Sequence, residues 1–327
     1  MSASLLEVSN LRVDFQQDGL LVRAVDGLTY SVDRGQTVAV IGESGSGKTV
    51  SSRAIMGLLP PTASVTGSIR FDDVEMVGLS EDAMREHRGR GVAMVFQDPT
   101  RSLNPTMRIG AQIREAIQTH EKVARAAAQD RAIELLELVR LPAARERLEQ
   151  YPHQLSGGMR QRVMIAIALA AEPKLLIADE ATTALDVTTQ AQIMELLRDL
   201  QQRLGMALIM ISHDLGLAAS FADEVVVMYA GRAVERAPTR KLFAHVRMPY
   251  TRALLDAIPR LENPSHSRLA AVPGQPPNLA LRELGCPFTP RCPNATDHCR
   301  DHEPAFEEHE PDHLWACWHP CADEARL

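Results

Sequence analysis

The order of apolar and polar residues along the chain predicts an alternation of strands and helices. Residues 5–15 alternate between the two classes, as a half-buried strand does, and residues 22–32 predict a second strand before a turn at Asp33-Arg34-Gly35. Further short strands are predicted at 37–41, 68–71 (at a sheet edge), 91–96, 174–178, 207–211 and 225–229. Helices are predicted at 50–58, 159–171 and 188–204. This order is typical of a mostly parallel α/β core.

Two stretches depart from the alternation. From residue 99 onward helical spacing dominates, with predicted core positions at Ile113, Ile117, Ile133, Leu136 and Val139. We therefore expect a helical subdomain over about residues 99–160, inserted into a main domain of residues 1–240. Beyond residue 240 the pattern loosens and prolines and histidines accumulate. All five cysteines follow residue 285, so residues 241–327 are expected to form a small Cys-rich C-terminal extension.

Composition narrows the classes of function. With 45% hydrophobic and 24% charged residues the chain has the composition of an ordinary soluble protein. Its net charge of −7 and its 4% of aromatic residues argue against a nucleic-acid-binding body. No apolar run approaches the roughly 20 residues that span a bilayer, and residues 1–8 lack the features of a secretion signal. We expect a cytoplasmic protein that reaches any membrane through a partner.

One loop carries the first candidate chemistry. The predicted strand at 37–41 runs into Gly42-Glu43-Ser44-Gly45-Ser46-Gly47-Lys48-Thr49 and then into a helix, which fills every position of the pattern G-x-x-x-x-G-K-[ST]. The glycines let backbone N–H groups surround a phosphate, and the helix N-terminus adds partial positive charge. We expect Lys48 to reach the β- and γ-phosphates of a nucleotide and Thr49 to bind Mg²⁺. The alternative is a glycine-rich turn that binds nothing.

Two later segments suggest what the chain does with a nucleotide. Asp179 and Glu180 end an apolar strand, where Asp179 would hold Mg²⁺ and Glu180 would act as general base or orient the attacking water. Such acids are also common as solvated loop residues. The second segment, Ser156-Gly157-Gly158, leads straight into a helix and makes a second anion site, the alternative being an ordinary N-cap serine. Two such sites on one chain suit a nucleotide enclosed between two protomers.

Residues 5 to about 235 resemble the nucleotide-binding subunits of ABC transporters. Residues 42–49 are similar to the Walker A loop, residues 175–180 to the Walker B strand with its catalytic glutamate, and residues 156–161 to the signature motif. Four shorter matches are the Q-loop Gln97, the D-loop Ala184-Leu185-Asp186, the switch His213 and the adenine-stacking Phe15, which is alternatively a core residue. The family usually has proline where Ala181 stands, a departure that loosens the loop and removes no catalytic atom.

The resemblance implies a P-loop NTPase core of the RecA type with an antiparallel β edge. It implies ATP as ligand, with Glu180, His213 and Gln97 in catalysis, and Mg²⁺ held by Thr49, Gln97 and Asp179. Two such domains pair head to tail, so that a set of residues would serve the partner's ATP: Ser156, Gly157, Gly158, Gln161 and Asp186. The implied partners are a second, homologous ATPase in a heterodimer, two membrane permeases and an external substrate-binding protein. The chain would lie at the cytoplasmic face of the inner membrane.

Three stretches narrow the resemblance to the ATPases of oligopeptide, dipeptide and nickel importers. They are residues 97–105, 249–255 and 272–277, although the second motif usually begins with His and here has Met248. The implied function is ATP hydrolysis that powers the import of dipeptides or oligopeptides. Nickel chelates and glutathione stay open as substrates. A soluble ABC ATPase without a transport role is the first rival function, and a non-catalytic assembly or metal-binding module is the second.

The cysteines suggest a further ligand. Cys286, Cys292, Cys299 and Cys317 have the spacing C-x5-C-x6-C-x17-C, which lacks the tight pair usual in zinc sites. Four separated thiolates suit an iron–sulfur cube, and the resemblance implies a [4Fe–4S] cluster at these residues. Zinc with mixed Cys and His ligands is the alternative, because histidines interleave with the cysteines, and free thiols are the third. Cys321 is expected to be a spare.

Overall fold

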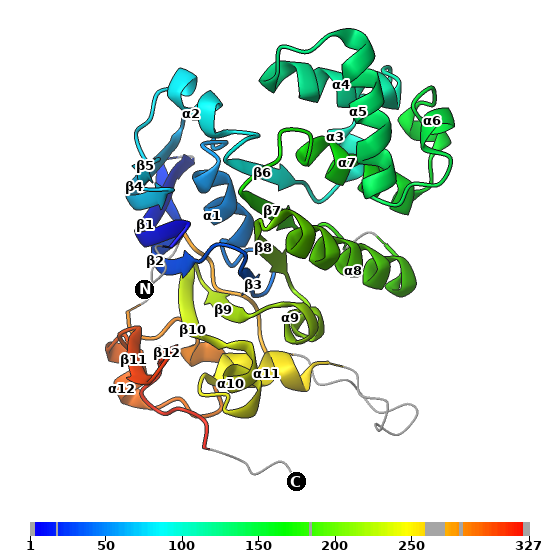
Figure 1. Cartoon of the computed structure of the whole chain (residues 1–327). Coiled ribbons are helices and arrows are strands. Elements are labelled where there is room, and N and C mark those ends of the chain that lie inside the picture. Colours follow the sequence, from blue (N-terminus) through cyan, green and yellow to red (C-terminus); the bar gives the residue numbers. More distant parts are fainter. Residues whose placement is uncertain (1–3, 18, 183–184, 259–271, 281–283, 323–327) are drawn as a thin grey trace. The chain divides into compact units, whose positions relative to one another are not determined.

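The computed structural model describes residues 4–17, 19–182, 185–258, 272–280 and 284–322, whose course along the chain is drawn in Figure 1. The chain divides into two compact units. The first comprises residues 1–32, 37–78 and 212–327, and the second comprises residues 33–36 and 79–211. The predicted domain boundary near residue 240 falls inside the first unit and stays a prediction.

The first unit contains an antiparallel sheet with the strand order β2-β1-β4-β5. Its strands are β1 (Leu6–Gln17), β2 (Leu20–Val32), β4 (Ala63–Phe71) and β5 (Val74–Glu75). The strands predicted at 5–15 and 22–32 are confirmed. The strand predicted at 68–71 is present as part of β4, but its predicted place at the sheet edge is wrong. β4 lies between β1 and the two-residue strand β5, and β5 pairs with Arg70 and Phe71 of β4.

A second set of strands in the first unit leads from the phosphate loop to the C-terminal extension. The strand β3 pairs in parallel with β9, and β10, β12 and β11 follow in antiparallel order. Their bounds are β3 (Thr37–Ile41), β9 (Glu224–Tyr229), β10 (Arg232–Pro238), β11 (Glu307–Glu310) and β12 (His313–Trp315). The helices are α1 (Lys48–Ile55), α9 (Leu215–Phe221), α10 (Thr239–Ala244), α11 (Pro249–Asp256) and α12 (Asp297–Asp301), with a 3-10 turn at Thr289–Arg291.

The second unit contains three parallel strands in the order β6-β7-β8, at β6 (Val92–Val95), β7 (Leu175–Asp179) and β8 (Ala207–Ser212). Each of these predicted strands is confirmed. Its helices are α2 (Glu81–His87), α3 (Pro99–Ser102), α4 (Ile109–His120), α5 (Arg125–Leu138), α6 (Ala144–Arg147), α7 (Gly157–Ala168) and α8 (Val187–Leu204), with a 3-10 turn at Pro152–Gln154. The five predicted core positions between residues 113 and 139 are all buried.

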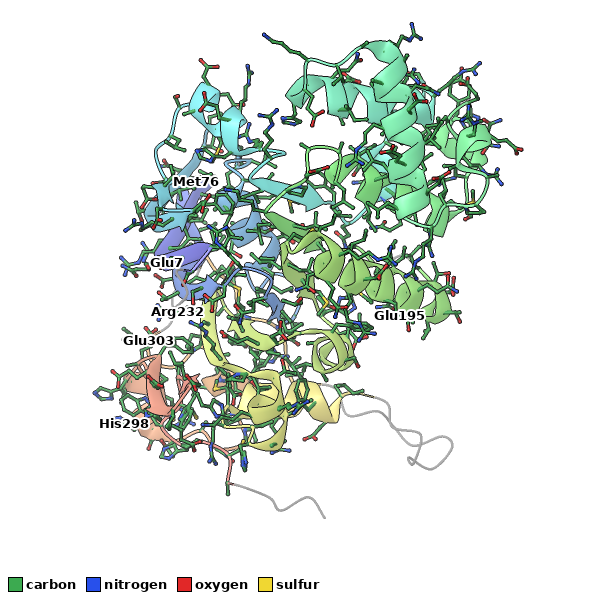
Figure 2. All side chains as sticks on the ribbon, viewed as in Figure 1. Glu7, Met76, Glu195, Arg232, His298 and Glu303 are labelled. Atoms are coloured by element: carbon green, nitrogen blue, oxygen red, sulfur yellow. The ribbon has the colours of Figure 1, made fainter. Side chains whose placement is uncertain are left out.

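The complete burial of three strands explains why short apolar runs in the sequence are enough to predict them. Every residue of β3, β7 and β8 is buried, because strands covered on both faces need a continuous aliphatic run in place of alternation. Figure 2 shows the side chains on the ribbon, and among the labelled ones Glu7, Glu195, His298 and Glu303 are exposed, whereas Met76 is buried. None of the helices in the described ranges combines the length and the apolar character that a membrane crossing needs.

Candidate nucleotide site

The phosphate loop connects β3 to α1 in the first unit, and two of its glycines are required by their surroundings. A Cβ atom on Gly42 would lie 2.2 Å from the carbonyl oxygen of Met228 in β9. Gly47 has φ +98°, and a Cβ there would lie 2.4 Å from the carbonyl oxygen of Ala24. The backbone of the loop therefore passes closer to its neighbours than any other residue would allow.

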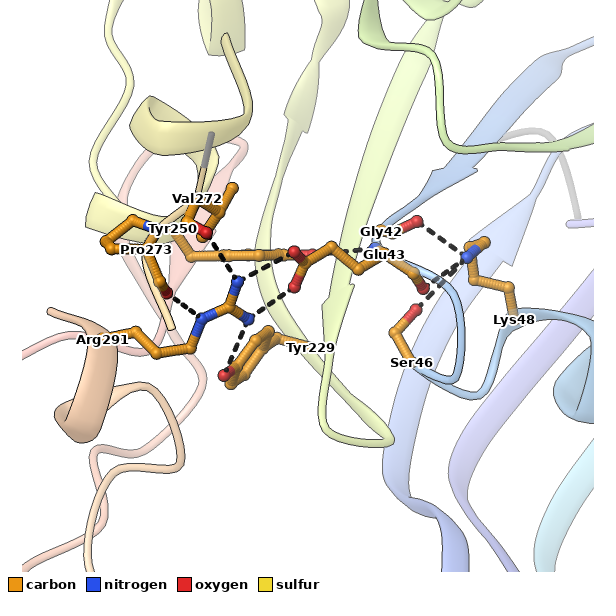
Figure 3. A network of polar contacts seen from close by, with 9 residues as sticks. All are labelled: Gly42, Glu43, Ser46, Lys48, Tyr229, Tyr250, Val272, Pro273 and Arg291. Atoms are coloured by element: carbon orange, nitrogen blue, oxygen red, sulfur yellow. Dashed lines mark hydrogen bonds and ion pairs between the residues drawn. The ribbon is translucent and has the colours of Figure 1, made fainter. Parts of the chain in front are cut away.

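Lys48 is buried inside this loop. Its ammonium donates hydrogen bonds to the carbonyl oxygens of Gly42 at 2.7 Å and Glu43 at 2.8 Å, and to Ser46 Oγ at 3.4 Å (Figure 3). The lysine begins α1, and no acidic residue lies in the first turn of that helix. The loop thus combines a fixed ammonium with the positive end of a helix dipole, which is the arrangement that binds phosphate groups.

Two residues that the sequence left unassigned contact the loop at Glu43. The Arg291 guanidinium binds the Glu43 carboxylate with distances of 2.6 and 2.9 Å, and the Glu43 N–H donates to the Tyr250 hydroxyl at 2.9 Å. Both partners lie more than 200 positions from Glu43, so no local pattern predicts the contacts. The only signal was that Tyr250 belongs to the family motif at 249–255.

In the second unit the structure brings Gln97 and Glu180 together. Gln97 Nε2 donates to Glu180 Oε2 at 2.7 Å, and the Glu180 N–H donates to the Ile211 carbonyl at 3.1 Å. Glu180 has φ +47°, a strained value for a residue with a side chain, which sets the direction of its carboxylate as the chain leaves β7. Asp179 ends β7 and is 2% exposed. An amide and a carboxylate in contact beside a buried aspartate suit the positioning of Mg²⁺ and water.

The signature residues open α7 in the second unit. Ser156 caps the helix by accepting from the Met159 N–H at 3.3 Å, and Ser156 and Gly157 are exposed. Gln161 is 1% exposed, and its Nε2 has no hydrogen-bond partner among the described residues. The structure thus leaves the first turn of α7 accessible and turns Gln161 inward.

The remaining predicted site residues lie at the ends of elements. Asp186 caps α8 by accepting from the Thr189 N–H at 2.9 Å, and this hydrogen bond lowers the pKa of Asp186. Ala184 of the predicted D-loop lies outside the described residues. His213 is exposed directly after β8, and Phe15 is half-buried in β1. Phe15 and His213 share the first unit with the phosphate loop, whereas Asp186 belongs to the second.

The four predicted metal-ligating cysteines line one small cavity in the first unit, together with Phe288 and His319. Burial raises the pKa of the Cys286 and Cys292 thiols and raises that of Cys317 to about 12. Cys321 is absent from this lining.

No group of three or more His, Cys, Asp or Glu side chains among the described residues has the arrangement of a metal-ion site. Among the described histidines of the extension, His319 lines the cavity, whereas the rings of His298 and His302 stack on each other at 4.4 Å, His309 stacks on Trp315 and His313 binds Glu235. One imidazole therefore lies beside the four thiols.

Comparison with known proteins gives two matches along the chain. Residues 25–183 match the model of the family "ABC transporter", and residues 234–299 match "Oligopeptide/dipeptide transporter, C-terminal region". The oligopeptide transport ATP-binding protein OppD of Bacillus subtilis is 48% identical over 322 residues, which cover 97% of this chain and 90% of that protein. OppD of Escherichia coli is 46% identical, with 97% and 94% covered.

Two further comparisons concern length and fold. OppD of Mycobacterium tuberculosis is 49% identical over 96% of this chain, but the chain spans only about half of that protein, 51% of its length. A dimeric ATP-binding cassette in a post-hydrolysis state with ADP and Pi has a TM-score of 0.65 at 27% identity, covering 72% of this chain and 99% of the other. A cassette of a Clostridium perfringens ABC transporter complex has a TM-score of 0.64 at 27% identity, covering 74% and 91%.

Proposed function

Because the chain belongs to the ATP-binding subunits of ABC transporters, in the branch of oligopeptide and dipeptide importers, we propose that it binds and hydrolyses ATP to power peptide import. The observation that carries the proposal is the presence, in one chain, of a complete phosphate loop with a buried Lys48 and of a segment at 234–299 that matches the peptide-importer region. The substrates are dipeptides or oligopeptides.

Hydrolysis requires a bound triphosphate, a metal ion and an activated water. Lys48 and the N–H groups at the start of α1 bind the β- and γ-phosphates. Thr49, Gln97 and Asp179 would hold Mg²⁺, which would supply positive charge to offset that of the phosphates. Glu180 takes a proton from the water as that water bonds to the γ-phosphorus and the bond to the β–γ bridging oxygen breaks. The hydrogen bond from Gln97 supports this role, because it orients the Glu180 carboxylate. His213 contacts the γ-phosphate.

The second half of the ATP site comes from another ATPase subunit. The exposed Ser156 and Gly157 at the start of α7 support this proposal, because they offer N–H groups and a helix dipole to a phosphate outside the chain. The similarity to a cassette solved as a dimer with ADP and Pi also supports it. The partners are a homologous ATPase, two permeases and an external binding protein, and the chain is peripheral at the cytoplasmic face of the inner membrane.

Copurification tests this assembly. The full chain is expressed with a tag from its native locus, and the complex is extracted in mild detergent and identified by mass spectrometry. We expect two permeases and a second ATPase in stoichiometric amounts. A chain that elutes alone, and that retains full ATP turnover, would favour the soluble ABC ATPase over the importer subunit.

For the C-terminal extension we propose a [4Fe–4S] cluster bound by Cys286, Cys292, Cys299 and Cys317. The four thiols line one cavity, which supports this proposal. The four irons of a [4Fe–4S] cluster each take one thiolate, so the four ligands stay farther apart than around a single metal ion. Iron binding would require the thiols to lose their protons. The bound cluster would cross-link four segments of the extension and so stabilise its fold.

Anaerobic purification with iron and sulfide analysis tests the cluster. We expect about four irons per chain by the stoichiometry of a cube, and loss of both iron and visible absorbance in Cys292→Ser. Cys321→Ser is the matched control and keeps them. A colourless wild type with about one zinc per chain would refute the cluster.

A further inference from the structure

The loop residue Glu43 is held from three directions. Its carboxylate binds Arg291 in a bidentate pair, its N–H donates to the Tyr250 hydroxyl, and its carbonyl oxygen accepts from Lys48 Nζ (Figure 3). Arg291 and Tyr250 both come from the C-terminal extension. Glu43 therefore joins the phosphate-binding lysine to a part of the chain that follows the family's core cassette.

Arg291 is unusually well fixed for a charged residue. Its side chain is only 3% exposed, and its Nε donates to the Pro273 carbonyl at 2.6 Å. The guanidinium carbon lies 5.7 Å from the centre of the Tyr229 ring and 5.9 Å from that of Phe288. The hydrogen bonds with Glu43 raise the pKa of Arg291, so the guanidinium stays charged. An ion pair of this burial and geometry fixes its partner far better than an exposed pair does.

Tyr250 is held by the same aromatic cluster. The rings of Tyr229, Tyr250 and Phe288 lie 4.6 to 5.4 Å apart and are each at most 2% exposed. Burial raises the pKa of Tyr250, so its hydroxyl remains a neutral acceptor for the Glu43 N–H. Through Tyr250 and Arg291 this buried cluster contacts both the backbone and the side chain of Glu43.

We propose that Arg291 and Tyr250 are positioning residues for the phosphate loop, so that the C-terminal extension sets the affinity of this chain for ATP. The inference rests on the proposed ATP binding. If Glu43 shifts, its carbonyl leaves Lys48 and the backbone from Gly42 to Ser44 moves with it. The loss should appear mainly in nucleotide binding and much less in the chemical step, which uses other residues.

The test measures equilibrium binding of a fluorescent ATP analogue with Mg²⁺ to the full chain, with thermal unfolding beside it. Arg291→Met should weaken binding about tenfold, the order of one lost charge-assisted hydrogen bond. Arg291→Lys should recover part of the affinity, because lysine keeps the charge and loses the bidentate geometry. Arg300→Met is the matched control, since Arg300 is 64% exposed in the same extension and its guanidinium pairs with the exposed Asp297.

A double-mutant cycle separates positioning from general stability. The double variant Glu43→Gln/Arg291→Met should bind the ATP analogue no more weakly than Arg291→Met alone, because both substitutions break the same contact. If Arg291→Met does not fold, Tyr250→Phe carries the test, since it keeps the ring, removes the acceptor and should weaken binding about threefold. Arg291→Met or Tyr250→Phe with wild-type affinity and a lower melting temperature would overturn the inference. A wild type that binds no nucleotide would instead overturn the proposed function.

Discussion

Replacing Gly42 with alanine should damage both the fold around the phosphate loop and the binding of ATP. The added Cβ would lie 2.2 Å from the Met228 carbonyl oxygen and 2.7 Å from Ser46 Oγ, whereas ordinary contacts begin near 3.4 Å. Ser46 can rotate, but the Met228 carbonyl belongs to β9, which pairs with β3 immediately before the loop. The backbone must therefore move by about 1 Å, because no side-chain rotamer relieves the contact.

The expected losses of stability and of nucleotide affinity in Gly42→Ala follow from this geometry. Overpacking between two backbone segments costs up to about 3 kcal/mol, and at about 2–4 °C per kcal/mol in a domain of this size the melting temperature should fall by roughly 6–12 °C. A 1 Å displacement of a positioning group can lower a reaction rate on the order of 100-fold, and we expect affinity for the fluorescent ATP analogue to fall clearly as well, because the same loop binds the phosphates.

Gly205→Ala is the matched control for Gly42→Ala. Gly205 ends α8 with φ +64° and has open space around its Cβ position, so only backbone strain of about 1 kcal/mol is expected there. Calorimetry and the binding titration are run on both variants. The reasoning is refuted if Gly42→Ala binds nucleotide like the wild type, or if it melts no lower than Gly205→Ala.

Two further predictions address catalysis and the extension. Glu180→Gln should keep nucleotide affinity and lower kcat by at least about 100-fold, as expected for a lost general base, with the exposed Glu195→Gln as control; turnover within about twofold of wild type would remove the assignment. His313→Ala should destabilise the extension by about 2 kcal/mol in thermal unfolding, because His313 Nε2 contacts the fully buried Glu235 at 3.0 Å. The exposed His309→Ala should cost much less, and equal losses in the two variants would contradict the burial argument.

Short, contiguous motifs predict their own local structure. The turn of the phosphate loop, the acids at the end of β7 and the serine cap of α7 follow from the sequence because each motif contains its own turn or cap, while the roles of these residues in catalysis stay predictions. The strands β3, β7 and β8 were equally predictable, since buried parallel strands need continuous apolar runs.

The features missed by the sequence depend on long-range packing. The pair of β11 and β12 is only four and three residues long, and Glu307–Glu310 has no apolar pattern. No local pattern distinguishes Arg291 in the C-terminal extension, because only the folded chain brings it to Glu43 across 248 positions. Gln161 was assigned from the motif alone, which gives a residue's role in a family and not the direction of its side chain.

The most direct test of peptide import is ATP hydrolysis by the complete complex reconstituted in lipid vesicles, with its external binding protein supplied empty or loaded with peptide. The account predicts hydrolysis that rises when the peptide-loaded binding protein is added and that disappears in Glu180→Gln. A hydrolysis rate that does not rise with the peptide-loaded binding protein, or that is unchanged in Glu180→Gln, would contradict the account.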